Sequence, residues 1–233
     1  MHFKRAKLAH LGNCRNMGET KCIAIFGGSG MTGQELIAAA LKKGLRVKAL
    51  YRPGSVPPSP PHGVEVITGL LDSADDVKRT LEGTDGAVIV FGPRLKRKRP
   101  ADVFCAAATA NIISEMKKLG IERLVCQIGA MAGGDTPNWS WFVRSFVRSY
   151  RKNFPAVNAD RDAQEVAVKE SGLDWTLVKP FRISKARGKG HVRAAQAVRI
   201  GMFTSVRRSD LAEFLVNEFM AGRFHHQAIY VVT

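Results

Sequence analysis

The chain has 233 residues, 45% of them hydrophobic, which is enough to bury one sizeable core. No apolar run approaches the roughly 20 residues that a membrane-spanning helix needs, so no spanning helix is expected. Lys and Arg number 36 against 20 Asp and Glu, and the net charge of +16 favours anionic partners such as phosphates, carboxylates, nucleic acid or an acidic membrane surface.

The N-terminal segment 1–20 is basic, with Glu19 as its only acid, and an apolar stretch follows it directly. A transit peptide is also basic and acid-poor, but this segment lacks a Ser-rich amphipathic pattern. We interpret 1–20 as a flexible extension, or as the product of an upstream start codon with Met17 as the natural start. Residues 21–233 are then expected to form one domain.

Short apolar strands alternate with helices along the first half of the chain. The loop 52–63 contains five prolines, which exclude it from a helix or a central strand. The predicted strands are 21–26, 46–51, 64–68, 86–91 and 122–128, and the predicted helices are 35–41, 74–81 with Ser73 as its cap, and 102–119. This alternation predicts an α/β fold, a doubly wound parallel sheet of Rossmann type in three α/β/α layers.

The C-terminal third is less regular. Aromatic residues and arginines recur at helical spacing over 139–154, and a basic loop is expected over 182–193. The remaining predicted elements are a helix at 160–170, a strand at 175–179, an amphipathic helix at 209–221 capped by Ser209, and a strand at 228–232.

A glycine-rich loop stands between the first strand and the first helix. Gly27, Gly30 and Gly33 have the spacing GxxGxxG, and Gly28 is an additional glycine. Glycines let the backbone turn tightly and approach a pyrophosphate, which the helix N-terminus then stabilises. An ordinary glycine-rich turn is the alternative, but the position at the first strand-to-helix turn favours dinucleotide binding.

The end of the second predicted strand distinguishes NAD from NADP. NAD sites usually place an acid there, which binds the ribose 2′-hydroxyl. This strand ends in Tyr51-Arg52, and an arginine fork suits a 2′-phosphate. We therefore expect NADP(H) as the cofactor, with a solvated surface arginine as the alternative reading of Arg52.

Five segments together carry a family resemblance: KCIAIFGGSGMTG, VKALYRPGS, GTDGAVIVFGPR, ANIISEMKKLGIERLV and ESGLDWTLVKP. From about residue 21 onwards the chain resembles the atypical short-chain dehydrogenase/reductase family with an NAD(P)H-binding domain, in particular its biliverdin-IXβ and flavin reductases. The resemblance implies hydride transfer from NADPH to a planar, electron-poor ring such as a flavin or a tetrapyrrole.

The resemblance also implies roles for individual residues. The nicotinamide ring would contact Pro180 and Phe181, and Arg52 would contact the 2′-phosphate. The pyrophosphate would lie on the loop residues, which are Gly27, Gly28, Ser29, Gly30, Met31, Thr32 and Gly33. The ribose-nicotinamide side would be lined by the residues that follow the fourth strand, which are Phe91, Gly92 and Pro93.

The chain departs from the family at several functional positions. Gly69-Leu70 stands where the family often has Gly-Asp near the adenine, and Phe181 replaces a histidine. The serine beyond the fifth strand aligns with Gly129, or with Cys126 or Gln127 if the alignment shifts. No YxxxK motif is present, since Tyr150 is followed by Arg-Lys-Asn-Phe. The absence of that tyrosine argues against alcohol-type dehydrogenation and epimerisation.

Two functions remain open at this point. Flavin-type reduction needs mainly alignment of two rings, because the reduced ring can take a proton from water. The alternative is a non-catalytic NADP-binding redox-sensing regulator or scaffold. We expect a reductase of a planar anionic acceptor, with Arg94, Gly129, Met131 and Arg182 on the substrate side; solvated surface charge is the alternative for the two arginines.

Four scattered cysteines without metal-ligand spacing, three of them in apolar surroundings, favour reduced thiols and a cytoplasmic protein. No metal is expected. Nucleic acid is not expected as a partner because no binding motif is present. The aromatic stripe of Trp139, Trp141, Phe142 and Phe146 is interpreted as a lid over the substrate, rather than as core or a membrane-surface face. The oligomeric state stays open.

Overall fold

The computed structural model describes residues 20–55, 61–93, 103–134 and 138–233, so the expected extension lies almost wholly outside the described residues. Its strands are β1 (Cys22–Phe26), β2 (Arg46–Tyr51), β3 (Val64–Thr68), β4 (Gly86–Ile89), β5 (Arg123–Gln127), β6 (Asp174–Pro180), β7 (Ile183–Ser184), β8 (Arg193–Ala195), β9 (Val206–Arg207) and β10 (Gln227–Val232). Its helices are α1 (Met31–Lys42), α2 (Ala74–Leu81), α3 (Cys105–Lys118), α4 (Trp141–Asn153), α5 (Pro155–Lys169) and α6 (Arg208–Ala221).

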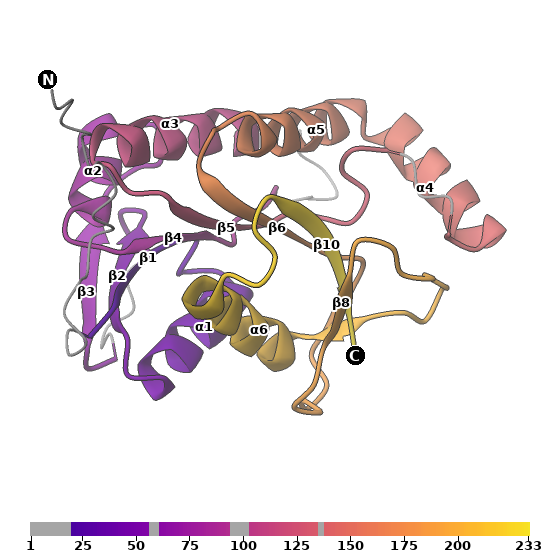
Figure 1. Ribbon diagram of the computed structural model, residues 1–233. Helices are drawn as coiled ribbons and strands as arrows, with labels where there is room; N and C mark the ends of the chain where they lie inside the picture. Colours follow the sequence, from indigo (N-terminus) through magenta and orange to yellow (C-terminus); the bar gives the residue numbers. More distant parts are fainter. Residues whose placement is uncertain (1–19, 56–60, 94–102, 135–137) are drawn as a thin grey trace, which may run out of the picture.

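Eight strands form the central sheet in the order β3-β2-β1-β4-β5-β6-β10-β8 (Figure 1). All neighbouring pairs are parallel except β10 and β8, which are antiparallel. The strand order reverses between β1 and β4, and the doubly wound sheet predicted from the sequence is confirmed. Strands β7 and β9 pair in a separate two-stranded sheet.

Helices cover both faces of the sheet (Figure 1). Helices α1 and α6 lie on one face, and α2, α3 and α5 lie on the other. The alternation of side chains along β1 explains the two cores: Ile23 and Ile25 belong to the cluster under α1 and α6, and Ala24 and Phe26 belong to the cluster on the opposite face. All residues of β1 are buried, as expected for a parallel strand covered on both sides.

Several predicted boundaries are corrected by tertiary contacts. Helix α1 begins at Met31, directly after the glycine loop, rather than at residue 35. Helix α5 begins at Pro155 rather than at residue 160, because proline is well accommodated at the first helical position. The basic loop expected over 182–193 contains β7 and the start of β8.

The expected cap of the last helix is also wrong. Helix α6 begins at Arg208 after Arg207, and no side chain caps its N-terminus, so Ser209 lies inside the helix. The carboxylate of Asp210 accepts hydrogen bonds from the backbone N–H groups of Lys189 and Gly190 at 2.9 and 3.0 Å. The acid in the first turn of α6 therefore stabilises the loop between β7 and β8 and does not cap the helix.

A third, smaller cluster lies beside the sheet and holds α4. It contains Ala130, Trp139, Val143, Val147 and Ile200. Helix α4 extends past the β10 and β8 edge of the sheet (Figure 1). None of the helices in the described ranges is long and apolar enough to cross a membrane.

Candidate functional site

The glycine loop brings β1 and α1 unusually close to each other. Gly27 has a φ of +103°, and a Cβ there would lie 2.8 Å from the backbone nitrogen of Phe91. At Gly33, inside α1, a Cβ would lie 2.7 Å from the Cα of Gly28 and still closer to the Gly27 oxygen. Only glycine permits this packing, so two positions of the GxxGxxG spacing have a direct steric reason.

The N-terminus of α1 opens onto the loop. Its N-cap is Gly30, which provides no capping side chain, and its first turn contains no acid. The first N–H groups of any helix lack intrahelical partners, and the helix dipole makes this end attractive to anions. Because the glycines carry no side chain that would keep a ligand away from these N–H groups, the loop fits a pyrophosphate group.

A cleft of about 810 Å³ lies over the carboxyl ends of β1 and β4, where the strand order reverses. Six residues predicted for the cofactor line it: Gly27, Ser29, Gly30, Arg52, Phe91 and Gly92. Other lining residues were not predicted: Leu50, Leu70, Leu71, Asp72, Val90, Val103, Phe104, Ala107, Ala108 and Asn111. Ligands of doubly wound sheets bind at such a switch point, which makes this cleft the candidate dinucleotide site.

The remaining predicted loop residues lie around the cleft rather than in its lining. A Cβ at Gly28 would contact Tyr51 and Ile37, so Gly28 lies behind the loop against the core. Met31 is exposed in the first turn of α1, where Thr32 is partly buried. Pro93 is partly buried after β4.

Arg52 follows β2 directly and is exposed at the rim of the cleft. Its carbonyl oxygen accepts hydrogen bonds from the N–H and the hydroxyl of Ser55 at 2.9 and 2.8 Å, which form a tight turn. No carboxylate in the described ranges pairs with its guanidinium group. Arg52 is therefore available to a ligand anion.

The turn after β3 lacks the family's Gly-Asp pair, and two other aspartates stand close by. Asp72, two residues beyond Leu70, lines the cleft. The carboxylate of Asp76 accepts a hydrogen bond from the N–H of Leu70 at 2.9 Å. This backbone hydrogen bond, with the Arg79 side chain, holds the pKa of Asp76 below its ordinary value. A charged carboxylate thus fixes the turn that carries Asp72.

Helix α3 forms the opposite wall of the cleft. Asn111 donates a hydrogen bond to the Leu71 oxygen at 2.8 Å and joins this wall to the turn after β3. The ring of Phe104 lies 5.6 Å from that of Phe91, centroid to centroid. The sequence offered one signal for this wall, because Ala107 and Asn111 are one helical turn apart on a small-residue face.

Arg161 of α5 contacts the segment Phe91-Gly92, which lines the cleft, and it was not predicted from the sequence. Its guanidinium donates a hydrogen bond to the Phe91 oxygen at 3.4 Å, and a Cβ built on Gly92 would lie 3.9 Å from it. Polar residues at 158, 161 and 165 share a helix face, but in the sequence such a face is typical of a solvated surface. Only the fold turns this face inward.

The predicted acceptor side combines open space with an aromatic wall. A Cβ at Gly129 would meet no atom within 4 Å. The ring of Phe181 packs edge-on against Trp139, with centroids 5.3 Å apart. Pro180 is buried, and its oxygen accepts a hydrogen bond from the N–H of Ala130 at 3.1 Å. The positions of the family serine and histidine thus provide neither a hydroxyl nor an imidazole.

A buried ion pair supports the turn at 129–132. The ammonium group of Lys179 donates hydrogen bonds to the Glu165 carboxylate at 2.7 Å and to the Ala132 oxygen at 2.8 Å. Burial would raise the pKa of Glu165, but hydrogen bonds from Lys169 and Lys179 outweigh it and hold that pKa below its ordinary value. Burial lowers the pKa of Lys179.

Helix α4 is joined to the same turn by Arg151. Its guanidinium donates hydrogen bonds to the Met131 oxygen at 3.0 Å and to the Asp162 carboxylate. Tyr150, the tyrosine without a YxxxK partner, has its ring centroid 5.0 Å from that of Phe154, and burial raises its pKa.

The other residues predicted for the substrate side lie away from the cleft or outside the described ranges. Arg94 lies outside them. Arg182 does not line the cleft; it is exposed and donates a hydrogen bond to the Phe203 oxygen at 3.3 Å. The predicted lid stays a prediction: Trp139 is buried in the small core, the other three aromatic residues are exposed, and none of the four lines the cleft. The three exposed residues are Trp141, Phe142 and Phe146.

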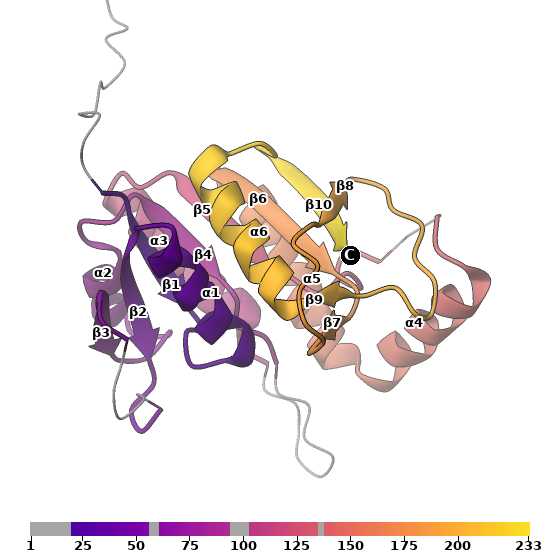
Figure 2. The same ribbon diagram turned by 90° about the horizontal axis from the view of Figure 1, so that it is seen from below.

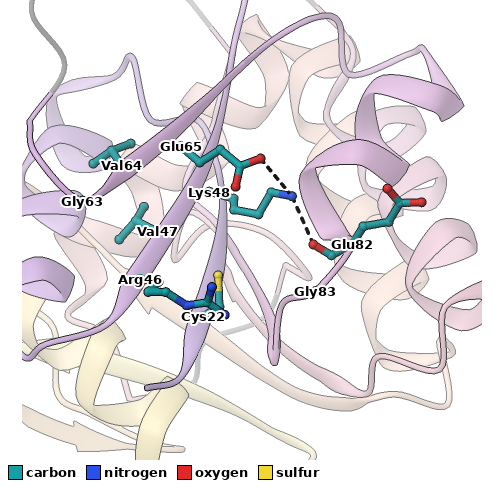
Figure 3. A pocket seen from close by; sticks show the side chains of 9 residues that line it. All are labelled: Cys22, Arg46, Val47, Lys48, Gly63, Val64, Glu65, Glu82 and Gly83. Carbon is teal, nitrogen blue, oxygen red and sulfur yellow. Dashed lines mark hydrogen bonds and ion pairs between the residues drawn. The ribbon is translucent and has the colours of Figure 1, made fainter. Parts of the chain in front are cut away.

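A second pocket, of about 470 Å³, lies at the amino ends of β2 and β3, at the edge of the sheet away from the glycine loop (Figure 3). Lys48, its most buried cation, lies 3.2 Å from a Glu65 oxygen and donates to the Glu82 carbonyl at 3.1 Å. Its charge is already compensated by these contacts, and the pocket lies at the amino ends of the strands, whereas doubly wound sheets bind dinucleotides at the carboxyl ends. The cleft at the glycine loop is therefore the better candidate.

Comparisons with known proteins agree with the site. The profile of the NAD(P)H-binding family matches residues 27–220. A candidate exported protein from Burkholderia pseudomallei is 25% identical, with a TM-score of 0.69 over 92% of this chain and 100% of that one. ChuY, an anaerobillin reductase from Escherichia coli O157:H7, is 19% identical, with a TM-score of 0.69 over 91% and 97%.

A short-chain dehydrogenase/reductase from Veillonella parvula DSM 2008, solved in complex with NADP, is 15% identical, with a TM-score of 0.72 over 91% of this chain and 94% of that one. At this identity the likeness establishes the Rossmann-type fold. The family profile covers most of the chain, including the glycine loop and the switch point of the sheet. The chain therefore belongs to the NAD(P)H-binding family.

Proposed function

We propose that the chain is an NADPH-dependent reductase that transfers a hydride to a flavin, a tetrapyrrole or a similar planar anionic acceptor, with residues 21–233 acting as one domain. One observation carries the proposal: a single cleft is lined by the glycine loop, by Gly92 and by Arg52, whose guanidinium has no carboxylate partner among the described residues. When bound, NADPH supplies the hydride from its nicotinamide ring.

Different residues of the cleft would bind different parts of the cofactor. The loop and the N-terminus of α1 would bind the pyrophosphate, and Arg52 would bind the 2′-phosphate through its planar fork. The turn at Asp72 and the α3 wall at Asn111 would enclose the adenosine. The NADP bound by the Veillonella parvula relative supports this assignment.

The acceptor side suits a flat ring better than a carbonyl. Gly129 leaves open space, while Phe181 and Met131 provide apolar surface. Such a site can align two rings but supplies no proton donor, and reduction of a flavin or a bilin needs mainly this alignment. The anaerobillin reductase among the structural relatives supports an open-chain tetrapyrrole as one acceptor.

A second candidate function is a non-catalytic NADP-binding regulator or scaffold. The observation that favours it is that Gly129 and Phe181, which stand at the positions of the family serine and histidine, have no side chain that could donate a proton. The two functions differ in one measurable property, which is whether bound NADPH is oxidised.

The test is NADPH oxidation by the purified full chain, followed by nicotinamide absorbance, with FMN, riboflavin and biliverdin as acceptors. Turnover with at least one acceptor supports the reductase. NADPH binding without turnover on any of them supports the regulator and overturns the reductase.

The three buried free thiols of Cys22, Cys105 and Cys126 support a cytoplasmic location, which cell fractionation tests.

Cofactor choice is tested separately with Arg52→Gln. The loss of a charged hydrogen-bonding group costs about 1.5–3 kcal/mol, so the Kd for NADPH should rise about 10- to 100-fold. The Kd for NADH should change little. Arg46→Gln is the matched control, because Arg46 is exposed at the opposite end of the same strand. Tighter binding of NADH than of NADPH by the unmodified protein would refute the assignment of Arg52.

A further inference from the structure

Helix α4 presents an aromatic face to solvent. The exposed fractions of Trp141, Phe142 and Phe146 are 69%, 57% and 51%. The rings of Trp141 and Phe142 stack with their centroids 3.6 Å apart. Large exposed aromatic side chains that gather on one helix mark an interaction site rather than an ordinary surface.

The orientation of α4 is fixed by the other side of the helix. Val143 and Val147, one helical turn apart, are buried against Trp139 and Ile200. With this pair in the small core, the three exposed aromatic residues cannot turn inward without unpacking α4. Their exposure therefore follows from the packing of α4.

A neighbouring turn extends the apolar surface. Trp139 and Ile200 form a β-bridge, and the N–H of Ser140 donates to the Ile200 oxygen at 3.1 Å. The chain from β8 to β9 consequently runs out to the start of α4 (Figure 2). This turn exposes Met202 by 53% and Phe203 by 90%. Together, Trp141, Phe142, Phe146, Met202 and Phe203 are called the α4 surface below.

The charges around the α4 surface are positive. Arg144 and Arg148 are exposed on α4 beside the aromatic residues, and α4 contains no acid in its sequence WFVRSFVRSYRKN. Arg199 is exposed just before the turn. The carboxylate of Asp162, which contacts α4, is bound by Arg151. The whole chain carries +16, so the complementary partner is anionic.

We propose that the α4 surface docks this protein on an anionic lipid bilayer, with its aromatic side chains at the headgroup boundary and its arginines on lipid phosphates. Helices that lie in the membrane interface carry aromatic residues on one face and basic residues on the adjoining polar face. On α4, Arg144 and Arg148 flank the exposed aromatic residues in this way, so they can contact lipid phosphates while the rings enter the headgroup boundary. The proposal is independent of the proposed reaction.

The geometry suits a flat partner. Helix α4 stands at one end of the described part of the molecule, beyond the edge of the sheet, and none of the described helices lies over its outer side (Figure 1). A bilayer can contact such a protruding helix and the adjacent turn at the same time. Basic residues near an acidic membrane contribute about fivefold each to binding.

The test is co-sedimentation of the full chain with phosphatidylcholine vesicles that contain or lack phosphatidylserine. We expect binding only to the anionic vesicles, weakened by salt. Arg144→Gln with Arg148→Gln should weaken it by about 25-fold, and Trp141→Ser with Phe146→Ser should abolish it without a change in net charge. Val166→Ser and Lys117→Gln, at exposed positions of α5 and α3, are matched controls.

Tryptophan fluorescence reports on the contact directly. Trp139 and Trp175 are buried, so a blue shift on vesicle binding arises from Trp141. Trp141→Phe should keep binding and lose the shift. Binding that persists in both double variants would place the lipid site elsewhere and overturn the proposal. Absence of vesicle binding, with a change of oligomeric state in the aromatic variant, would assign the surface to self-association and also overturn it.

Discussion

The carboxylate of Asp160 accepts a hydrogen bond from the backbone N–H of Cys105 at 2.9 Å, although the two residues are 55 positions apart. A second hydrogen bond, also of 2.9 Å, comes from Ala106. Asp160 of α5 thereby caps α3, whose own N-cap residue, Phe104, provides no capping side chain. Because Phe104 lines the cleft, this contact also fixes one wall of the candidate cofactor site.

Removal of this cap should destabilise the fold. Asp160→Ala leaves the buried N–H of Cys105 and the partly buried N–H of Ala106 without their acceptor, and loss of a helix cap costs about 0.5–2 kcal/mol, with a further penalty for burial. We expect the free energy of unfolding in urea to fall by about 1–3 kcal/mol. Glu170→Ala, an exposed acid at the end of α5, should change it by less than about 0.5 kcal/mol. Equal effects of the two substitutions would contradict the capping role.

The glycines of the site should differ sharply in their tolerance of alanine. Gly33→Ala forces a Cβ into the backbone at Gly27 and Gly28, so we expect a loss of about 1–3 kcal/mol in stability and weaker NADPH binding. Gly129→Ala, with no atom within 4 Å of the new Cβ, should leave stability unchanged. Thermal unfolding of both variants makes the comparison; an unchanged Tm for Gly33→Ala would show that the loop is not tightly packed.

The buried pair of Glu165 and Lys179 should make stability depend on pH. The folded-state pKa of Glu165 is below its ordinary 4.5, so the unfolded chain binds its proton more tightly. Its contribution is full above about pH 4.5 and is lost as pH falls through the folded-state pKa. Stability should therefore decline below about pH 4.5.

Glu165→Gln tests that contribution. Breaking a buried ion pair costs about 3–5 kcal/mol, and we expect a loss near this size at neutral pH. The difference from the unmodified protein should shrink as pH falls below about 4.5. Glu65→Gln removes the exposed partner of a half-buried ion pair with Lys48 and should cost no more than about 1 kcal/mol, because Lys48 keeps its hydrogen bond to the Glu82 carbonyl. A difference that is constant across the acid range would exclude a role for the Glu165 charge.

Arg161 should affect the acceptor more than the fold. If it faces an anionic acceptor beside Gly92, Arg161→Gln raises the KM for FMN by about tenfold and leaves that for uncharged riboflavin nearly unchanged. Arg46→Gln serves as the control in the same assay. Equal increases for FMN and riboflavin would mean that Arg161 acts on ring alignment rather than on the phosphate.

Local patterns were enough to predict the first half of the fold. The buried run at β1 and the glycines after it act within a few residues, because strand burial, tight turns and helix N-termini depend on neighbouring side chains. Ser73 is a clear case: its hydroxyl accepts the hydrogen bond from the Asp76 N–H that a helix cap requires. The strand order then follows from the handedness of parallel crossovers.

Helix boundaries in the second half could not be predicted in the same way. Helix α3 begins where Asp160, distant in sequence, supplies a cap, and Ser209 is not a cap because the chain enters α6 one residue earlier. Both outcomes depend on contacts between segments that no window of the sequence contains.

The sequence by itself therefore determined the Rossmann-type sheet and the glycine loop, including Arg52 at the strand end, since each depends on short-range sterics and on hydrophobic periodicity. The tertiary structure alone decided which residues complete the cleft. Asp72 and Asn111 come from two separate elements and line the cleft, and Arg161 of α5 holds the lining residue Phe91 by a hydrogen bond to its oxygen; only packing of α3 and α5 on the sheet brings them to the same edge. The tertiary structure also fixes the orientation of α4: Val143 and Val147 are buried in the small core, so the exposed aromatic residues of the same helix face solvent.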